Sequence, residues 1–150
     1  MRVETQQSFT DNAHSALTFA QEEAKRFNHQ ALCDEHILIG LVRVRESTAG
    51  QLLYRLGLEV EPTRSMVKRL TGVSELPIEP TSKLAASTKQ ILEDALKDAI
   101  NTKNKLIGTG HLLLAIAKGK QSISIDTLRH FGISPDQLQY YQDELIGQFR

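Results

Sequence analysis

The sequence predicts an all-α fold of eight helices, arranged as two pseudo-twofold related repeats of four helices each. Three observations predict it. A shift of 75 residues aligns the two halves of the 150-residue chain without a gap. Apolar residues recur at the three- and four-residue spacing of helices in both halves. No stretch shows the sustained alternation, bounded by hairpin turns, that marks a β-strand.

The internal repeat rests on residues that recur at the same offset, with similar apolar residues in the intervals. The identical pairs are Leu17 and Leu92, Ala20 and Ala95, Ala24 and Ala99, His36 and His111, Leu38 and Leu113, Leu53 and Leu128, and Gly57 and Gly132. The repeats are predicted over about 8–72 and 82–147. The connector 73–81 holds two prolines, which prevent a continuing helix. Because each four-helix unit is short, we expect both to share a core in a single domain over 1–150.

Four helices are predicted in the first repeat, over about 11–27, 34–42, 48–56 and 62–72. Thr10 or Asp11 caps the first helix, and Asp34 caps the second. The second helix is nearly all apolar and is therefore expected to be buried. The third helix stops at Gly57, a residue suited to the left-handed position after a helix.

The second repeat follows the same plan, with helices over about 84–99, 110–117, 125–131 and 135–146. Thr109 is predicted to cap the second of these helices. Gly132 ends the third helix, and Ser134 followed by Pro135 opens the fourth.

Composition excludes several classes of protein. The formal net charge is zero and no long basic stripe occurs, so the chain lacks the charge that nucleic-acid binding requires. No apolar run approaches the roughly twenty residues of a membrane span. Cys33 is the single cysteine, which excludes an internal disulfide and fits a reducing compartment. We expect a cytoplasmic protein, or one of the plastid stroma if a transit peptide has been removed.

The motifs of catalysis are missing from the sequence. No phosphate-binding loop of the form G-x-x-x-x-G-K-[ST] occurs, and Gly108-Thr109-Gly110 follows no strand, so it is interpreted as a turn. The five histidines show no pairing at i, i+4, which argues against a zinc site. Cys33 precedes a helix and is interpreted as a packed thiol rather than a reactive one. We therefore expect no enzyme, with no catalytic residue, no cofactor and no metal.

Three motifs of the first repeat carry a family resemblance. They are Phe9-Thr10, the sequence AQEEA at 20–24 and the sequence DEHILIGL at 34–41. With them the chain resembles the double Clp-N motif, the amino-terminal domain of ClpA/ClpC-type AAA+ unfoldase chaperones, here without the ATPase modules. The resemblance covers about residues 8–147, and the second repeat is degraded but in register.

The resemblance implies a non-catalytic protein-docking module that binds adaptor proteins or tagged substrates. In the ClpC branch the motif Glu binds the guanidinium of phosphorylated arginine, and the Thr of Phe-Thr helps to hold the phosphate. Carried over, these residues are Glu35 and Thr10, and His14 would add a donor. The second repeat has Ala85 and Gly110 instead, so such binding is expected once per chain, in the first repeat.

Other interpretations stay open. Thr10 would serve equally as a plain helix cap, and Glu35 as a first-turn carboxylate that complements the helix dipole. His36 and His111 are interpreted as structural histidines with satisfied hydrogen bonds. The chain would alternatively be an accessory or assembly subunit that binds the Clp protease core or chaperone ring. Adaptors, substrate proteins or Clp ATPase/protease subunits are thus the expected partners, and nucleic acid and membranes are not.

Overall fold

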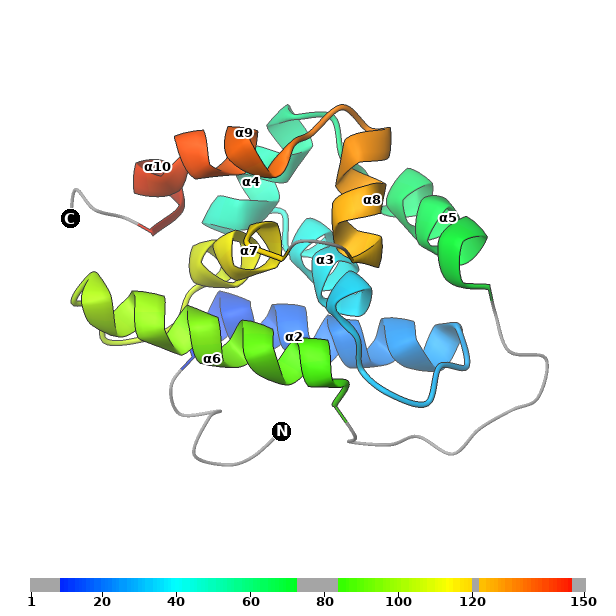
Figure 1. Ribbon diagram of the computed structural model, residues 1–150, viewed down its shortest axis with the longest axis horizontal. Helices are drawn as coiled ribbons and strands as arrows, with labels where there is room; N and C mark the ends of the chain where they lie inside the picture. The colour runs from blue at the N-terminus through cyan, green and yellow to red at the C-terminus, as the bar shows by residue number, and fades with distance from the viewer. Residues whose placement is uncertain (1–8, 73–83, 120–121, 147–150) are drawn as a thin grey trace.

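The computed structural model describes residues 9–72, 84–119 and 122–146, and helices dominate these ranges (Figure 1). The connector predicted over 73–81 lies outside them. The helices are α2 (Asp11–Arg26), α3 (Asp34–Arg43), α4 (Thr48–Arg55), α5 (Val60–Thr71), α6 (Ala86–Asn101), α7 (Thr109–Ala117), α8 (Ile123–His130), α9 (Pro135–Tyr140) and α10 (Gln142–Ile146). The described ranges contain no sheet, only isolated bridges between Phe9 and Ile107 and between Leu32 and Leu84.

The last helix departs from the prediction, which gave one helix over 135–146. The structure breaks it at Tyr141, so that nine helices replace eight in the described residues. The break lets α10 approach α7 closely. A Cβ atom on Gly110 would overlap the carbonyl oxygen of Leu145. The hydroxyl of Thr48 also donates to that carbonyl, at 3.3 Å.

Of the caps predicted at Thr10, Asp34 and Thr109, the first is confirmed and the other two are corrected; Ser134 also opens α9, as predicted. The Thr10 hydroxyl oxygen accepts a hydrogen bond from the third backbone N–H of α2, at 3.1 Å, as a cap does. Asp34 and Thr109, predicted as caps, are instead the first residues of α3 and α7. Their caps are Cys33 and Gly108, which precede histidines that take over the capping role, as described below.

Two reciprocal hydrogen bonds relate the repeats. The backbone N–H of Thr10 donates to the carbonyl of Ile107 at 2.9 Å, and that of Ala85 donates to the carbonyl of Leu32 at 3.0 Å. Each donor and each acceptor in one bond lies 75 residues from its counterpart in the other. The first helix of each repeat therefore starts beside the loop that precedes the second helix of the other repeat.

The core is built on α3 and α7, which lie at the centre of the molecule (Figure 1). Every residue of α7 is buried, as is every residue of α3 except Arg43. The largest cluster of buried apolar side chains draws on both repeats. Gly40 lets α3 cross α2 at close range, because a Cβ atom there would overlap the carbonyl oxygen of Ala16.

Candidate functional site

Thr10 lies at the start of α2 and is partly buried. It lines a shallow surface hollow of about 610 Å³, and the other lining residues all come from 102–106, the turn after α6. His14 is exposed on the following turn of α2, where its backbone N–H donates to the Thr10 carbonyl at 2.8 Å. The predicted phosphate-binding residue of the first repeat thus faces the second repeat.

Glu35 lies in the first turn of α3 and is buried. Burial raises the pKa of Glu35 to about 7, and the negative charge of Asp34 adds to the effect. Asp34 accepts hydrogen bonds from the hydroxyls of Ser87, at 3.3 Å, and Ser124, at 2.5 Å. This carboxylate pair therefore lies where α3 meets helices of the second repeat.

The structure does not bring Thr10 and Glu35 together. Thr10 caps the start of α2, whereas Glu35 lies near His29, just beyond the end of that helix. The 16 residues of α2 span about 24 Å. The reciprocal packing is the physical reason, because it places the start of each repeat's first helix beside the loop that precedes the other repeat's second helix. One small ligand does not reach both residues.

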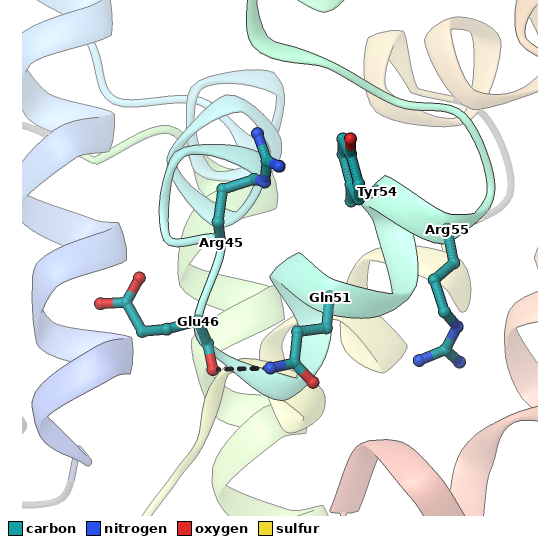
Figure 2. A pocket seen from close by; sticks show the side chains of 5 residues that line it. All are labelled: Arg45, Glu46, Gln51, Tyr54 and Arg55. Carbon is teal, nitrogen blue, oxygen red and sulfur yellow. Dashed lines mark hydrogen bonds between the residues drawn. The ribbon is translucent and has the colours of Figure 1, made fainter.

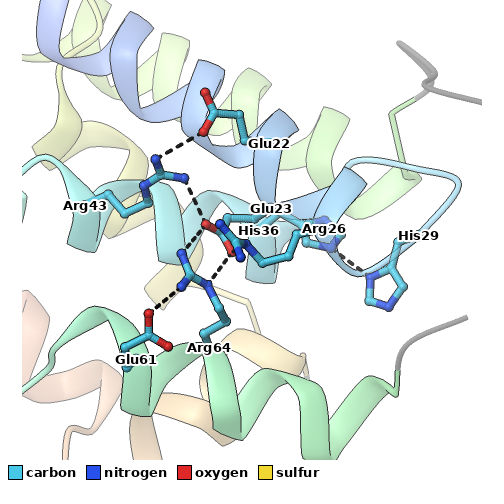
Figure 3. Close-up of polar contacts among 8 residues, drawn as sticks. All are labelled: Glu22, Glu23, Arg26, His29, His36, Arg43, Glu61 and Arg64. Atoms are coloured by element: carbon cyan, nitrogen blue, oxygen red, sulfur yellow. Dashed lines mark hydrogen bonds and ion pairs between the residues drawn. The ribbon is translucent and has the colours of Figure 1, made fainter.

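His36 takes part in a chain of hydrogen bonds with one consistent direction, and Figure 3 shows the link between His36 and His29. The N–H of Cys33 donates to Nδ1 of His36 at 2.9 Å, so the proton of His36 is on Nε2. That Nε2–H donates to Nδ1 of His29 at 2.8 Å, and Nε2 of His29 donates to the carbonyl of Gly72 at 2.9 Å. Burial, with the charge of His29, lowers the pKa of His36 to about 4. We refer to this chain of bonds as the histidine relay.

His111 has the same role in the second repeat. Its Nδ1 accepts from the N–H of Gly108 at 3.0 Å, and its Nε2 faces the Thr102 hydroxyl at 3.5 Å. Burial lowers the pKa of His111. The prediction that His36 and His111 are structural histidines with satisfied hydrogen bonds is confirmed.

His29, Glu35 and His36 offer potential metal ligands within 4.8 Å of one another, although the sequence predicted no metal site. The overlooked signal was the seven-residue separation of the histidines, which spans a turn rather than a helix. A metal on Nε2 of His36 would move the proton to Nδ1, which faces the N–H of Cys33. Two donors would then oppose each other, so these hydrogen bonds favour the histidine relay over a metal.

Cys33 is partly buried, and its thiol lies 3.6 Å from the carbonyl oxygen of Ala31. Burial raises the pKa of the thiol to about 11, with contributions from the charges of Glu35 and Asp34. A thiol with a raised pKa is a poor nucleophile at neutral pH. The interpretation of Cys33 as a packed thiol agrees with this geometry.

Glu23 is the centre of an ionic cluster that the sequence analysis missed (Figure 3). Its buried carboxylate accepts from Arg43 at 2.9 Å and from Arg64 at 2.9 and 2.7 Å. Burial alone would raise the pKa of Glu23, but the hydrogen bond and charge of Arg64 hold it below its usual range. The counterparts Asp98 and Lys118 also pair, at 2.8 Å. This recurrence under the 75-residue shift was the signal available in the sequence.

A second surface hollow, of about 480 Å³, lies beside α4 (Figure 2). The Arg45 guanidinium lies over the ring of Tyr54, 3.8 Å from its centroid. Arg55 forms an ion pair with Glu144 of α10 at 2.7 Å. Figure 2 shows the Glu46 carboxylate turned away from Tyr54. The hollow presents an arginine stacked on an exposed aromatic ring.

Three exposed large apolar side chains lie along α6 and in the turn after it. Leu96 is 42 % exposed, Ile100 63 % and Leu106 41 %. Leu96 and Ile100 are four residues apart and thus lie on one face of the helix. We refer to these three residues as the α6 stripe. Their counterparts in the first repeat are Gln21, Lys25 and Ala31, so α2 has no such stripe.

Within the described ranges, no helix combines the length and the apolar character that crossing a bilayer requires.

Comparison with known proteins gives one family. The model described as "Clp repeat (R) N-terminal domain" matches twice, at residues 8–82 and 83–150. The chaperone protein ClpB of Oceanobacillus iheyensis is 32 % identical over 139 residues, which are 93 % of this chain. The chain spans 17 % of the length of that relative.

Solved structures agree with this match. The Hsp104 N-terminal domain from Candida albicans superposes with a TM-score of 0.75 at 26 % identity, covering 95 % of this chain and 94 % of that one. A ClpV N-domain solved in complex with a VipB peptide gives a TM-score of 0.69 at 17 % identity, covering 99 % and 94 %. With both halves matched and the same arrangement of helices, the chain belongs to the Clp repeat N-terminal domain family.

Proposed function

We propose that the chain is a non-catalytic docking module that binds adaptor or substrate proteins for a Clp chaperone or protease system. The α6 stripe is the observation that carries the proposal. Three large apolar side chains remain in contact with water, whereas the counterparts of Leu96 and Ile100 on α2 are Gln21 and Lys25. Exposed apolar side chains that cluster in this way are typical of protein-binding surfaces. Burying one of them fully contributes about 1.5–3 kcal/mol.

A structural relative supports a peptide as the form of the partner. The ClpV N-domain, which has the same fold, was solved with a VipB peptide. On this chain we assign the docking surface to the α6 stripe together with Thr10 and His14, which lie at the neighbouring end of α2. In the cytoplasm or plastid stroma, where we place the protein, unfolded segments of client proteins would be available to it.

Glu35 belongs to a separate part of this proposal. We propose it as the residue that would pair with a guanidinium if the chain binds phosphorylated arginine. Glu35 is 5 % exposed and lies away from Thr10, so such a ligand would bind without the threonine hydroxyl. Titration with phosphoarginine, followed by NMR, tests this role. Shifts at Glu35 that disappear in the Glu35→Ala variant support it, and shifts confined to Thr10 and His14 contradict it.

The alternative function is an accessory or assembly subunit that binds the Clp protease core or chaperone ring. The same α6 stripe would then contact a folded subunit instead of a peptide. Crosslinking from a photoreactive residue at position 97, next to the stripe, separates the two functions. Adaptors and client proteins in the crosslinked product support the docking module, and Clp ATPase or protease subunits support the alternative.

The direct test uses fluorescence anisotropy with a labelled leucine-rich peptide. The variant Leu96→Gln/Ile100→Gln should weaken binding about ten-fold or more, because it removes most of the exposed apolar surface of α6. Leu70→Gln is the matched control, since Leu70 is 41 % exposed but lies on α5. Equal binding by the wild type and the double variant would contradict the proposal.

A further inference from the structure

The turn after α6 has a backbone conformation that its residue does not favour. Lys103 has a φ of 63°, in the left-handed region. Its counterpart Asn28 has a φ of 57°, so the two repeats share this turn. Asparagine tolerates the left-handed region, whereas lysine rarely adopts it. The second repeat therefore keeps a lysine at a position where an asparagine would be less strained.

A second lysine follows in the same turn. Lys103 and Lys105 are both exposed, and neither forms an ion pair within the described residues. Their counterparts, Asn28 and Gln30, are uncharged. The turn of the second repeat thus gains two positive charges relative to the first.

These lysines lie at one end of the α6 stripe. Ile100 comes before them in the chain and Leu106 directly after, and the lysines line the 610 Å³ hollow with Thr10. The Thr10 hydroxyl oxygen accepts from Ala13, which leaves its hydrogen to donate to an anion. Asp11, next to Thr10, adds one exposed carboxylate, so the two lysines still leave this end positive.

We propose that the docking surface takes a segment that carries apolar side chains next to a cluster of carboxylates. The apolar part lies on the α6 stripe, and the acidic part lies on Lys103, Lys105 and Thr10. Charge complementarity supports this choice, since a basic segment would meet two unpaired lysines. The inference rests on the proposed docking function and specifies the class of segment that docks.

Two labelled peptides test which sign of charge the docking surface prefers next to the apolar side chains. Both carry the same four leucines, followed by Asp-Glu-Asp-Glu in one and by Lys-Arg-Lys-Arg in the other. Anisotropy at low salt should show the acidic peptide binding about three- to ten-fold more tightly to the wild type. The difference should disappear at about 0.5 M salt, because exposed charges are screened.

The variant Lys103→Asn/Lys105→Gln places the residues of the first repeat in this turn. It should bind both peptides equally, and its melting temperature should be unchanged or higher because asparagine tolerates the turn. Equal binding of both peptides by the wild type would overturn the inference while leaving the docking function intact. An acidic preference that survives in this variant would also overturn it. Failure of the wild type to bind either peptide would instead contradict the docking function and, with it, this inference.

Discussion

The two repeats share the residues that shape the backbone and differ in the residues that face solvent or a ligand. His36 and His111 accept the same backbone N–H at the starts of α3 and α7. Gly57 and Gly132 have φ values of 97° and 81° at equivalent helix ends. By contrast, Leu96 and Ile100 of the α6 stripe stand where α2 has Gln21 and Lys25. The comparison teaches that shared residues shape the helix ends of both repeats, whereas divergent residues set each repeat's surface and, at Gly110, its packing against α10.

The largest expected loss of stability comes from a residue at the start of α7 that differs from its counterpart at the start of α3. Gly110→Glu places the residue of the first repeat where a Cβ atom would overlap the carbonyl oxygen of Leu145. We expect a loss of more than about 3 kcal/mol in the free energy of unfolding, since backbone rather than a flexible side chain must move. Urea denaturation followed by circular dichroism measures it. A loss below about 1 kcal/mol would show that α10 moves away from residue 110 with little loss of stability.

The next largest loss of stability is expected at the ion pairs that occur at equivalent positions in the two repeats. Glu23→Gln leaves Arg43 and Arg64 around a neutral side chain in a buried place, and we expect a loss of about 3 kcal/mol. The matched control is Asp98→Asn, because the Asp98–Lys118 pair is exposed and no second cation joins it among the described residues; we expect a loss of less than about 1 kcal/mol. Urea denaturation measures both losses. Equal losses in the free energy of unfolding would mean that the buried ion pair stabilises the fold no more than the exposed one.

The smallest effect concerns the buried carboxyl of Glu35 and depends on pH. Its pKa rises from the ordinary 4.5 to about 7 in the folded chain, so the folded state holds the proton more tightly than the unfolded state. The free energy of unfolding therefore falls as the pH rises from about 4.5 to beyond 7.

The variant Glu35→Gln removes that dependence. At pH 8.5 it should be more stable than the wild type by about 2 kcal/mol, and the gain should shrink towards pH 4. Denaturation curves for both proteins across this range provide the check. A pH-independent difference would mean that Glu35 keeps an ordinary pKa in the folded protein.

The sequence predicted most of the fold because each helix carries its own apolar periodicity and its own end signals. The prediction failed where contacts between residues far apart in the sequence determine the structure. The break at Tyr141 depends on how closely α10 approaches Gly110, which is far away in sequence. The separation of Thr10 from Glu35 depends on the reciprocal packing of the repeats, and local patterns do not encode it. Glu23 was missed because Arg43 and Arg64 lie 20 and 41 residues away.

The reciprocal hydrogen bonds of Thr10 with Ile107 and of Ala85 with Leu32 have an evolutionary consequence. Each repeat contributes the same donor and the same acceptor to the other, which is the geometry of an isologous homodimer. The chain is thus built like two subunits fused in tandem. In a true homodimer any substitution appears on both sides of the axis. Fusion removes that constraint, so one half can carry apolar and cationic side chains at positions where the other half carries uncharged or polar ones.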